Sequence, residues 1–443
     1  MIGIALRWVG LGSSVPTFDE TFGAGISRLP VGDMFEYLRE ADWHPPLDYL
    51  VRRPVVGTYS AFWLRGPSAA AGTATLIAVA LWMRRSGWLG VAVVTLTSFA
   101  TIQLLYARTA RMYAFLILGG TILAIVSDRW LDRPRTRWAV AAGVTLFFTA
   151  LAQQVVLFMV PGLLLVAGRR RDREAWVWRA WVMGGAVAWL VVWGPTFLDQ
   201  MSVRRTSWIP LTTPRGIYDA VTGQVTLSPA LQFIVFAATI VGGALLVRRH
   251  PRLGRVWLYV LVVPAVVVMV IGLQVHVLLP RSISFAALAP VLAFGAIVEW
   301  LLDDPPLGVG RVVTVPAAVA VLLLGSASAW SAVSYEEDLA PLRSELVASA
   351  SPGDVVAVHP RFLGPILEWD LQLPRESISV PGLDSTETWT GRLPGMPTGR
   401  AWILVPDTYG RPAVPPSAVP CPDAPVRVEG PATLHCLDGF AST

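Results

Sequence analysis

Residues 112–128 read MYAFLILGGTILAIVSD, and no charged side chain interrupts this run before Asp128. A run of this kind is close to what an α-helix needs to cross about 30 Å of hydrocarbon. Ten further apolar runs occur, at 1–16, 67–83, 87–106, 138–152, 154–168, 178–196, 228–247, 255–275, 283–300 and 312–333. The sequence therefore predicts a polytopic α-helical membrane protein with about eleven transmembrane helices.

The composition agrees with a membrane protein. Only 15% of the residues are charged, where soluble domains have about a quarter, and the mean hydropathy is +0.56. The net charge of +5 comes from arginine, since the chain has no lysine. Many of these arginines cluster in short loops between the apolar runs rather than on one soluble face, so we expect no nucleic-acid partner. No cleavage site follows the first run, and we expect it to remain as a span.

The short loops predict the orientation, because cytoplasmic loops collect arginine. With eleven spans, four arginine-rich loops fall on the side of the N-terminus. We therefore expect a multi-pass plasma-membrane protein with a cytoplasmic N-terminus. The arginines concerned are Arg84, Arg85, Arg129, Arg133, Arg135, Arg137, Arg169, Arg170, Arg171, Arg173, Arg248, Arg249, Arg252 and Arg255.

Three polar segments then face the outside. Residues 17–66 and 197–227 are loops of a membrane domain, 1–335, and residues 336–443 form a soluble extracytoplasmic domain. Strand-like runs at 354–358 and 401–405, among turns rich in proline and glycine, predict a small α/β fold for it. Its two cysteines, Cys421 and Cys436, either form a disulfide or remain as two buried or unpaired thiols.

Polar residues gather at span ends on this external side. A carboxylate there can deprotonate a sugar hydroxyl as it attacks an anomeric carbon. Arginines can hold a lipid-linked phosphate and stabilise its charge as it leaves. The segments are Phe18-Asp19-Glu20, the stretch Trp43-His44-Pro45-Pro46-Leu47-Asp48-Tyr49, the stretch Ala107-Arg108-Thr109-Ala110-Arg111-Met112-Tyr113, and Pro280-Arg281-Ser282. Together they indicate glycosyl transfer from a lipid phosphate.

Each of these signals also has a structural interpretation. Asp19 and Glu20 can cap a short helix, and His44 can hold a turn through a backbone hydrogen bond. Arginines at span ends often reach toward lipid headgroups. Trp208 can anchor the chain at the membrane interface.

Three motifs, Asp19-Glu20, His44-Pro45-Pro46-Leu47 and Ala110-Arg111-Met112-Tyr113, resemble those of the mannosyltransferase-like membrane glycosyltransferases of the GT-C superfamily. That superfamily includes the protein O-mannosyltransferases and the aminoarabinose lipid A transferases. Trp208-Ile209-Pro210, Pro280-Arg281 and Pro352-Gly353-Asp354 are similar to the same family.

The resemblance implies an inverting enzyme that moves a hexosyl or pentosyl group from a polyprenyl-phosphate donor on the outer face of the membrane. The acceptor would be a cell-envelope glycan, lipid or protein. It also implies roles for individual residues: catalysis for Asp19 as general base with Glu20 and His44, donor-phosphate binding for Arg111, Arg281 and Arg108, and substrate binding for Asp48, Tyr49, Tyr113 and Trp208.

The sequence departs from the family pattern at three places. Thr109 replaces a usual glutamate, Asp48 a usual tyrosine, and Gln153-Gln154 a usual His-Tyr pair. Whether a divalent metal takes part therefore stays open, and we expect no other cofactor. Two alternative functions also stay open. A transporter or flippase of a lipid-linked sugar usually has internal repeats, which this chain does not show. A catalytically inactive member that binds lipid-linked sugar would fit the departures.

Overall fold

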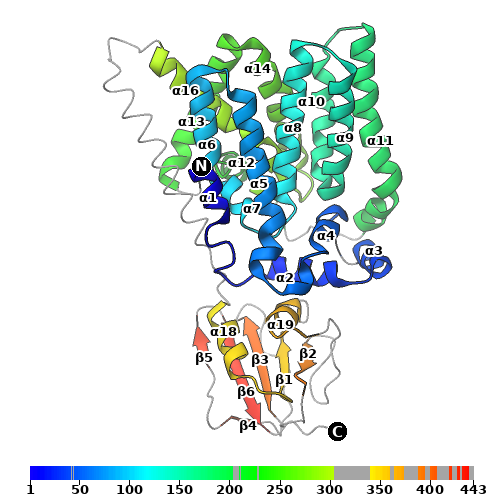
Figure 1. Ribbon diagram of the computed structural model, residues 1–443, viewed down its shortest axis with the longest axis vertical. Coiled ribbons are helices and arrows are strands. Elements are labelled where there is room, and N and C mark those ends of the chain that lie inside the picture. The colour runs from blue at the N-terminus through cyan, green and yellow to red at the C-terminus, as the bar shows by residue number, and fades with distance from the viewer. Residues whose placement is uncertain are drawn as a thin grey trace. The chain divides into compact units, whose positions relative to one another are not determined.

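A computed structural model gives the fold (Figure 1). It describes residues 1–40, 42, 44–202, 209, 211–226, 229–303, 340–359, 364–373, 388–394, 400–406, 419–421, 427–429 and 432–438. The helices in the first part of the chain are α1 Ile2–Trp8, α2 Phe18–Arg28, α3 Val31–Glu40, α4 Leu47–Arg52, η1 Val56–Thr58, α5 Ala61–Met83, α6 Gly87–Phe99, α7 Thr101–Ala107, α8 Tyr113–Asp132, α9 Thr136–Ala152, η2 Gln154–Phe158 and α10 Met159–Val166.

The remaining helices are α11 Arg173–Ser202, α12 Pro214–Thr222, α13 Pro229–Arg249, α14 Pro251–Arg255, η3 Val256–Val262, α15 Val263–Ile271, η4 Pro280–Ala286, α16 Leu288–Asp303, α18 Ala340–Ser349 and α19 Gly364–Asp370. The strands are β1 Val355–Val358, β2 Trp389–Arg392, β3 Ala401–Pro406, β4 Val419–Pro420, β5 Arg427–Glu429 and β6 Ala432–Asp438. Of the η elements, η3 is a π-helix and the others are 3-10 helices.

The chain divides into two compact units. The first consists of Met1–Leu11, Val31–Val51 and Arg65–Ser334. The second consists of Gly12–Pro30, Arg52–Leu64 and Tyr335–Thr443. Two segments from the N-terminal part of the chain therefore belong to the unit of the C-terminal residues. The sequence alone had grouped them with the membrane domain.

The first unit is a bundle of apolar helices and is membrane-embedded. Among the described residues, five helices or helix runs are long and apolar enough to cross a membrane, and the number rises to seven if two bent pairs count as one span each. Two shorter apolar helices correspond to the expected runs at 138–152 and 154–168. The expected run at 312–333 lies outside the described residues. A total of about eleven spans stays a prediction.

The first expected span, 1–16, is wrong as a single helix. Helix α1 ends at Trp8, and Gly10 adopts a φ of 64° directly after it. Glycine takes this left-handed conformation without a steric penalty, and it commonly ends helices. Pro16 further along has no amide hydrogen to donate to a continuing helix.

One of the bent pairs is α6–α7, where the helix axis turns by 50°. A break in an apolar helix frees backbone groups that lipid cannot satisfy. The buried Arg7 donates to the carbonyls of Thr97 and Ser98 on one side of the break. On the other side, the Thr101 amide and hydroxyl both donate to the Val225 carbonyl. The break is therefore stabilised by specific protein partners.

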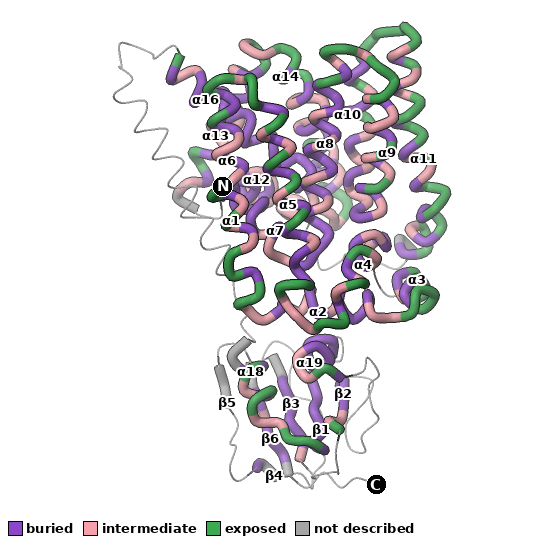
Figure 2. The backbone as a smooth tube through the Cα atoms, in the orientation of Figure 1, coloured by how far each residue is buried: buried purple, intermediate pink, exposed green. Residues whose placement is uncertain are grey.

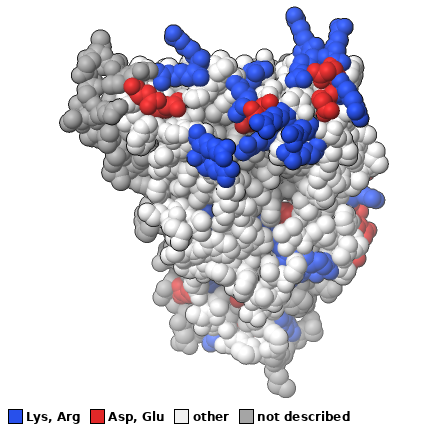
Figure 3. All heavy atoms as spheres, turned by 45° about the horizontal axis from the view of Figure 1, so that its top comes forward, with Lys and Arg blue, Asp and Glu red and all other residues white. Residues whose placement is uncertain are grey.

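The arginine-rich loops gather at one end of the first unit. Figure 3 shows the blue arginine side chains concentrated there, with acidic side chains among them. Figure 1 shows α14 at this end of the bundle, and α3 and α4 at its other end. The short loops thus share one side, and its assignment to the cytoplasm stays a prediction.

The second unit is built on a mixed sheet with the strand order β2-β1-β3-β6-β4, and β5 also pairs with β6. Strands β1 and β3 are parallel, with Val356 opposite Trp402, and the other pairs are antiparallel. Both strand-like runs that the sequence predicted are confirmed as β1 and β3. Figure 2 shows β1 as buried along its length.

Both faces of this sheet are covered, because the alternating residues of β1 belong to two different cores. Val356 and Val358 pack in one cluster with Leu346 of α18 and Ile366 of α19. The intervening residues of β1 pack in a second cluster with Ala401, Ile403 and Leu437. In the structure Cys421 and Cys436 form a disulfide, with their Cα atoms 5.4 Å apart, and both lie in the first cluster.

Candidate active site

The carboxylates of the Asp19-Glu20 pair differ in their surroundings. Both lie in the first turn of α2, where negative charge is favourable. Glu20 is 1% exposed, and its Oε2 accepts a hydrogen bond of 2.8 Å from the backbone N–H of Thr17, the N-cap residue. Glu20 therefore caps the helix, as the structural interpretation of the pair suggested. Asp19 is only half-buried and is the more accessible acid.

Helix α2 is held by the C-terminal part of its own unit. Phe18 packs against the cluster between the sheet and its helices. The fully buried Arg343 of α18 donates 2.7 Å to the Pro16 carbonyl, just before α2. The same guanidinium makes two hydrogen bonds, of 2.8 and 2.9 Å, to the carboxylate of Asp370. The tail thus fixes the helix that carries Asp19.

A cavity of about 560 Å³ lies within this second unit, beside the segment that leads into α2. Its size falls in the range of small-molecule sites. The lining is mostly polar and includes Ser13, Ser14, Tyr59, Arg343, Trp369 and Gln372.

In the first unit, the connection between α3 and α4 forms a hydrogen-bonded cluster around Asp42. Its carboxylate lies 2.9 Å from His44 Nδ1 and accepts a hydrogen bond from the Tyr49 hydroxyl. The buried Gln200 of α11 donates through Nε2 to the backbone carbonyls of Asp42 and Leu38, at 2.5 and 2.6 Å. The contact with Asp42 orients His44 through its Nδ1. The other ring nitrogen, Nε2, takes no part in this contact.

The charges in this cluster hold Asp42 ionised. Burial by itself raises the pKa of the Asp42 carboxyl group, but His44, the Tyr49 hydrogen bond and the Arg111 charge together lower that pKa to about 2. The pKa of Tyr49 is raised well above its usual value, first by burial and then by Asp42, so its hydroxyl keeps its proton. The charge of Arg111 lowers the pKa of Tyr49, and the charge of Asp48 raises it. Residues from two separate motifs therefore interact here.

Tyr113 lies beside Arg281, the second arginine predicted to bind the donor phosphate. It is the first residue of α8, two positions after the buried Arg111. The guanidinium carbon of Arg281 lies 6.0 Å from the centre of the Tyr113 ring, and Tyr106 of α7 stacks on that ring at 4.6 Å. Guanidinium groups such as those of Arg111 and Arg281 can bind a phosphate through charge-assisted hydrogen bonds.

The segment that carries Arg281 is placed by neighbours far away in the sequence. The carbonyl of Pro280 accepts a 2.8 Å hydrogen bond from Gln224 Nε2. Helix α8 approaches η4 so closely that a Cβ atom on Gly120 would lie 2.2 Å from the Phe285 carbonyl oxygen. Only glycine permits this approach, so Gly120 sets the spacing between α8 and η4.

Arg108, the third predicted phosphate ligand, has other partners. It donates to the carbonyls of Leu6, Val9 and Gly10 at 2.7–3.1 Å. These carbonyls end helix α1, and a cation is favourable there. The geometry therefore leaves Arg108 out of the phosphate site that we propose below.

The sequence overlooked three residues that organise this region, Asp42, Gln200 and Gln224. Asp42 could have been noticed, because it precedes His44 by two positions in the quoted motif. Trp208, a predicted substrate ligand, lies outside the described residues. Within the described part of the chain, no three histidine, cysteine, aspartate or glutamate residues lie together as a metal site would require.

The chain consists of an apolar helix bundle that carries these motifs and a unit built on a small mixed sheet. Two solved structures with this fold are of ArnT, an aminoarabinose lipid A transferase, from Cupriavidus metallidurans. The likeness confirms the fold that the motif resemblance predicted.

The structure of ArnT bound to undecaprenyl phosphate superposes with a TM-score of 0.56 at 16% identity, over 98% of this chain and 96% of that chain. The structure of ArnT in the apo state gives 0.58 at 15% identity, over 99% and 97%. No protein-family model matches the sequence, and no curated protein matches it either.

Proposed function

We propose that this protein is an inverting glycosyltransferase that uses a polyprenyl-phosphate sugar as its donor. The observation that carries the proposal is Arg281 beside Tyr113, with the buried Arg111 two positions before Tyr113, in a chain with the fold of ArnT. The ArnT structure with this fold was determined with undecaprenyl phosphate bound. A polyprenyl phosphate offers the anionic group that two such arginines would bind.

In the proposed reaction the acceptor hydroxyl oxygen attacks the anomeric carbon of the donor sugar, and its proton passes to the Asp19 carboxylate. The bond between that carbon and the phosphate oxygen breaks, and the electron pair leaves with the polyprenyl phosphate. Arg111 and Arg281 stabilise the negative charge that develops on the departing oxygen. One displacement from the opposite side inverts the anomeric centre.

The remaining residues have supporting roles in this proposal. Asp42 orients His44 and Tyr49, and its negative charge partly balances Arg111. His44 and Asp48 are candidate contacts to the donor sugar. The polar cavity of the second unit is the candidate place for the polar part of the acceptor. A cell-envelope glycan, lipid or protein fits this role.

The test separates donor binding from transfer. Purified protein in nanodiscs is given radiolabelled polyprenyl-phosphate sugars and a membrane extract as acceptor. Asp19→Asn should bind donor normally and reduce transfer by at least a hundredfold, because removing a general base typically costs 10²–10⁴-fold. Asp33→Asn, an exposed aspartate of α3, is the matched control and should keep full activity. Normal turnover by Asp19→Asn would rule out its role as base.

The arginines are tested by donor binding itself. Arg111→Ala and Arg281→Ala should each weaken donor binding at least tenfold, whereas the exposed Arg39→Ala should not. Saturable donor binding without transfer by the wild type would favour a binding protein over an enzyme. If the wild type neither binds nor transfers any donor, the transporter alternative gains weight.

The proposed orientation places the N-terminus in the cytoplasm, with the motifs and the C-terminal residues outside and about eleven spans between. Cysteines introduced as Arg85→Cys and Asp33→Cys test it, because the two positions lie at opposite ends of the first unit. A membrane-impermeant maleimide applied to intact cells should label only the cysteine at position 33. Labelling at position 85 alone would reverse the orientation.

A further inference from the structure

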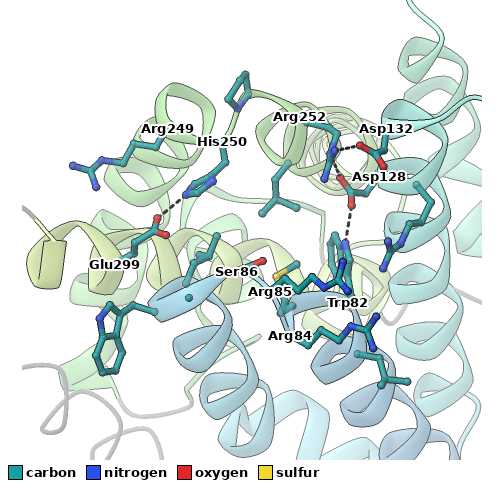
Figure 4. Close-up of a pocket in the computed structure, with 18 of the residues that line it drawn as sticks. Trp82, Arg84, Arg85, Ser86, Asp128, Asp132, Arg249, His250, Arg252 and Glu299 are labelled. Atoms are coloured by element: carbon teal, nitrogen blue, oxygen red, sulfur yellow. Dashed lines mark hydrogen bonds and ion pairs between the residues drawn. The ribbon is translucent and has the colours of Figure 1, made fainter.

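A second cavity, of about 790 Å³, opens at the end of the first unit that carries the arginine-rich loops. It lies where the end of α5, the loop to α6, the end of α8, the start of α14 and the last turn of α16 come together. The proposed glycosyl transfer uses none of its residues. Figure 4 shows its lining, which contains both arginine and acidic side chains.

Most of the acidic side chains in this cavity already have cationic partners. Glu299 lies 2.6 Å from His250 Nε2. Asp128 accepts a 2.8 Å hydrogen bond from Arg252 and a 2.9 Å hydrogen bond from the indole N–H of Trp82. Asp132 also pairs with Arg252, as the dashed lines in Figure 4 mark. These pairs join α8, α14 and α16 into a fixed frame around the cavity.

Three arginines that line the cavity remain available to bind a ligand. We call Arg84, Arg85 and Arg129 the cavity arginines. All three are exposed, and within the described residues their side chains make no hydrogen bond or ion pair. Arginines that merely balance neighbouring acids would be paired with them, as Arg252 is. Three unpaired guanidinium groups around one cavity instead offer a concentrated site for an anion, and their planar forks suit phosphate.

The surroundings of the cavity arginines favour a lipid over a soluble phosphate. Leu81, on the last turn of α5, is 58% exposed, and Trp88, at the start of α6, is 54% exposed. Both line the same cavity. An apolar side chain and an indole next to arginines are typical of the depth at which lipid headgroups meet acyl chains. A ligand that carries both a phosphate and acyl chains satisfies the two halves of this surface.

We propose that this cavity binds the phosphate headgroup of an anionic phospholipid through the cavity arginines. The acyl chains of that lipid lie against Leu81 and Trp88. The site differs from general attraction of arginines to an anionic membrane, because it depends on three particular side chains around a frame of internal ion pairs. It lies at the opposite end of the first unit from α3 and α4.

The experiment measures lipid binding to the full-length protein in detergent by native mass spectrometry. The probes are phosphatidylglycerol, phosphatidylcholine and inorganic phosphate. The test variant, Arg84→Gln/Arg85→Gln/Arg129→Gln, removes the cavity arginines. The matched control, Arg169→Gln/Arg171→Gln/Arg173→Gln, removes as many exposed arginines at the same end of the unit but outside the cavity. Both variants therefore have the same net charge.

We expect the test variant to lose at least tenfold in affinity for phosphatidylglycerol and the control to stay within twofold of wild type. Phosphatidylcholine should bind the wild type more weakly. Equal losses in both variants would overturn the proposal, because they would indicate general charge attraction. Inorganic phosphate that binds as tightly as the lipid would also overturn it, in favour of a soluble anion.

A second variant covers the case in which the triple substitution disturbs folding. Ser86→Glu keeps every arginine and adds one negative charge to the lining of the cavity. It should weaken phosphatidylglycerol binding severalfold through charge repulsion. Unchanged binding by a folded Ser86→Glu protein contradicts the assignment of the headgroup to this cavity.

Discussion

Replacing Arg343 by methionine should loosen the helix that carries Asp19. The Arg343 side chain is fully buried, and the side chain of its partner Asp370 is 6% exposed. The substitution leaves the Asp370 carboxylate and the Pro16 carbonyl buried without a donor. Breaking a buried ion pair from one side costs about 3–5 kcal/mol. The cost falls on the local structure that joins α2 to the sheet.

A double variant separates this buried charge from the loss of packing. In Arg343→Met/Asp370→Leu no unpaired charge remains, and well-packed apolar replacements of a buried pair are often close to neutral. The Pro16 carbonyl still lacks its donor, which costs about 1–3 kcal/mol. We therefore expect the double variant to recover about 2 kcal/mol of the loss in the single variant.

Amide hydrogen exchange on the full-length protein in nanodiscs measures the loss of stability in α2 itself. Exchange reports the free energy of opening segment by segment. The amides of α2 should exchange at least a hundredfold faster in Arg343→Met and regain much of that protection in the double variant. Arg39→Met, at an exposed position, should exchange like wild type. Wild-type exchange of α2 in Arg343→Met, or a double variant as fast as the single one, would refute the reasoning.

Three further predictions follow from local geometry. The pKa of Asp42 in the folded protein is about 2, below its usual 3.8. The ionised carboxylate therefore stabilises the folded protein above about pH 4, and this contribution is lost as the pH falls toward 2. The melting temperatures of wild type and Asp42→Asn should converge as the pH is lowered over that range. Gly120→Ala should push η4 away from α8 and weaken donor binding, whereas Gly184→Ala, which meets no atom within 4 Å, should bind donor normally. Reducing the Cys421–Cys436 disulfide, which spans fifteen residues, should destabilise the sheet by about 3 kcal/mol, seen as faster amide exchange in β3 and β6.

The sequence by itself determined the membrane-embedded helices and the motifs. Long apolar runs without charge have few alternatives to a transmembrane helix, because an apolar chain in lipid must satisfy its own backbone. The expected run 112–128 became α8, and both predicted strands formed. Local signals of this kind depend only on neighbouring residues, so they can be read without the fold. The resemblance in the first 115 residues also predicted the fold found in ArnT.

Only the tertiary structure decided how the motif residues are used. Glu20 and Arg108 carry charges that suit catalysis, yet one caps α2 and the other holds the end of α1. Asp42 belongs to none of the motifs quoted from the sequence, yet it is the centre of the cluster that orients His44. The helix of Asp19 is held by Arg343, more than three hundred residues away. Such partnerships depend on which side chains fill a buried space together, and spacing along the chain does not encode that.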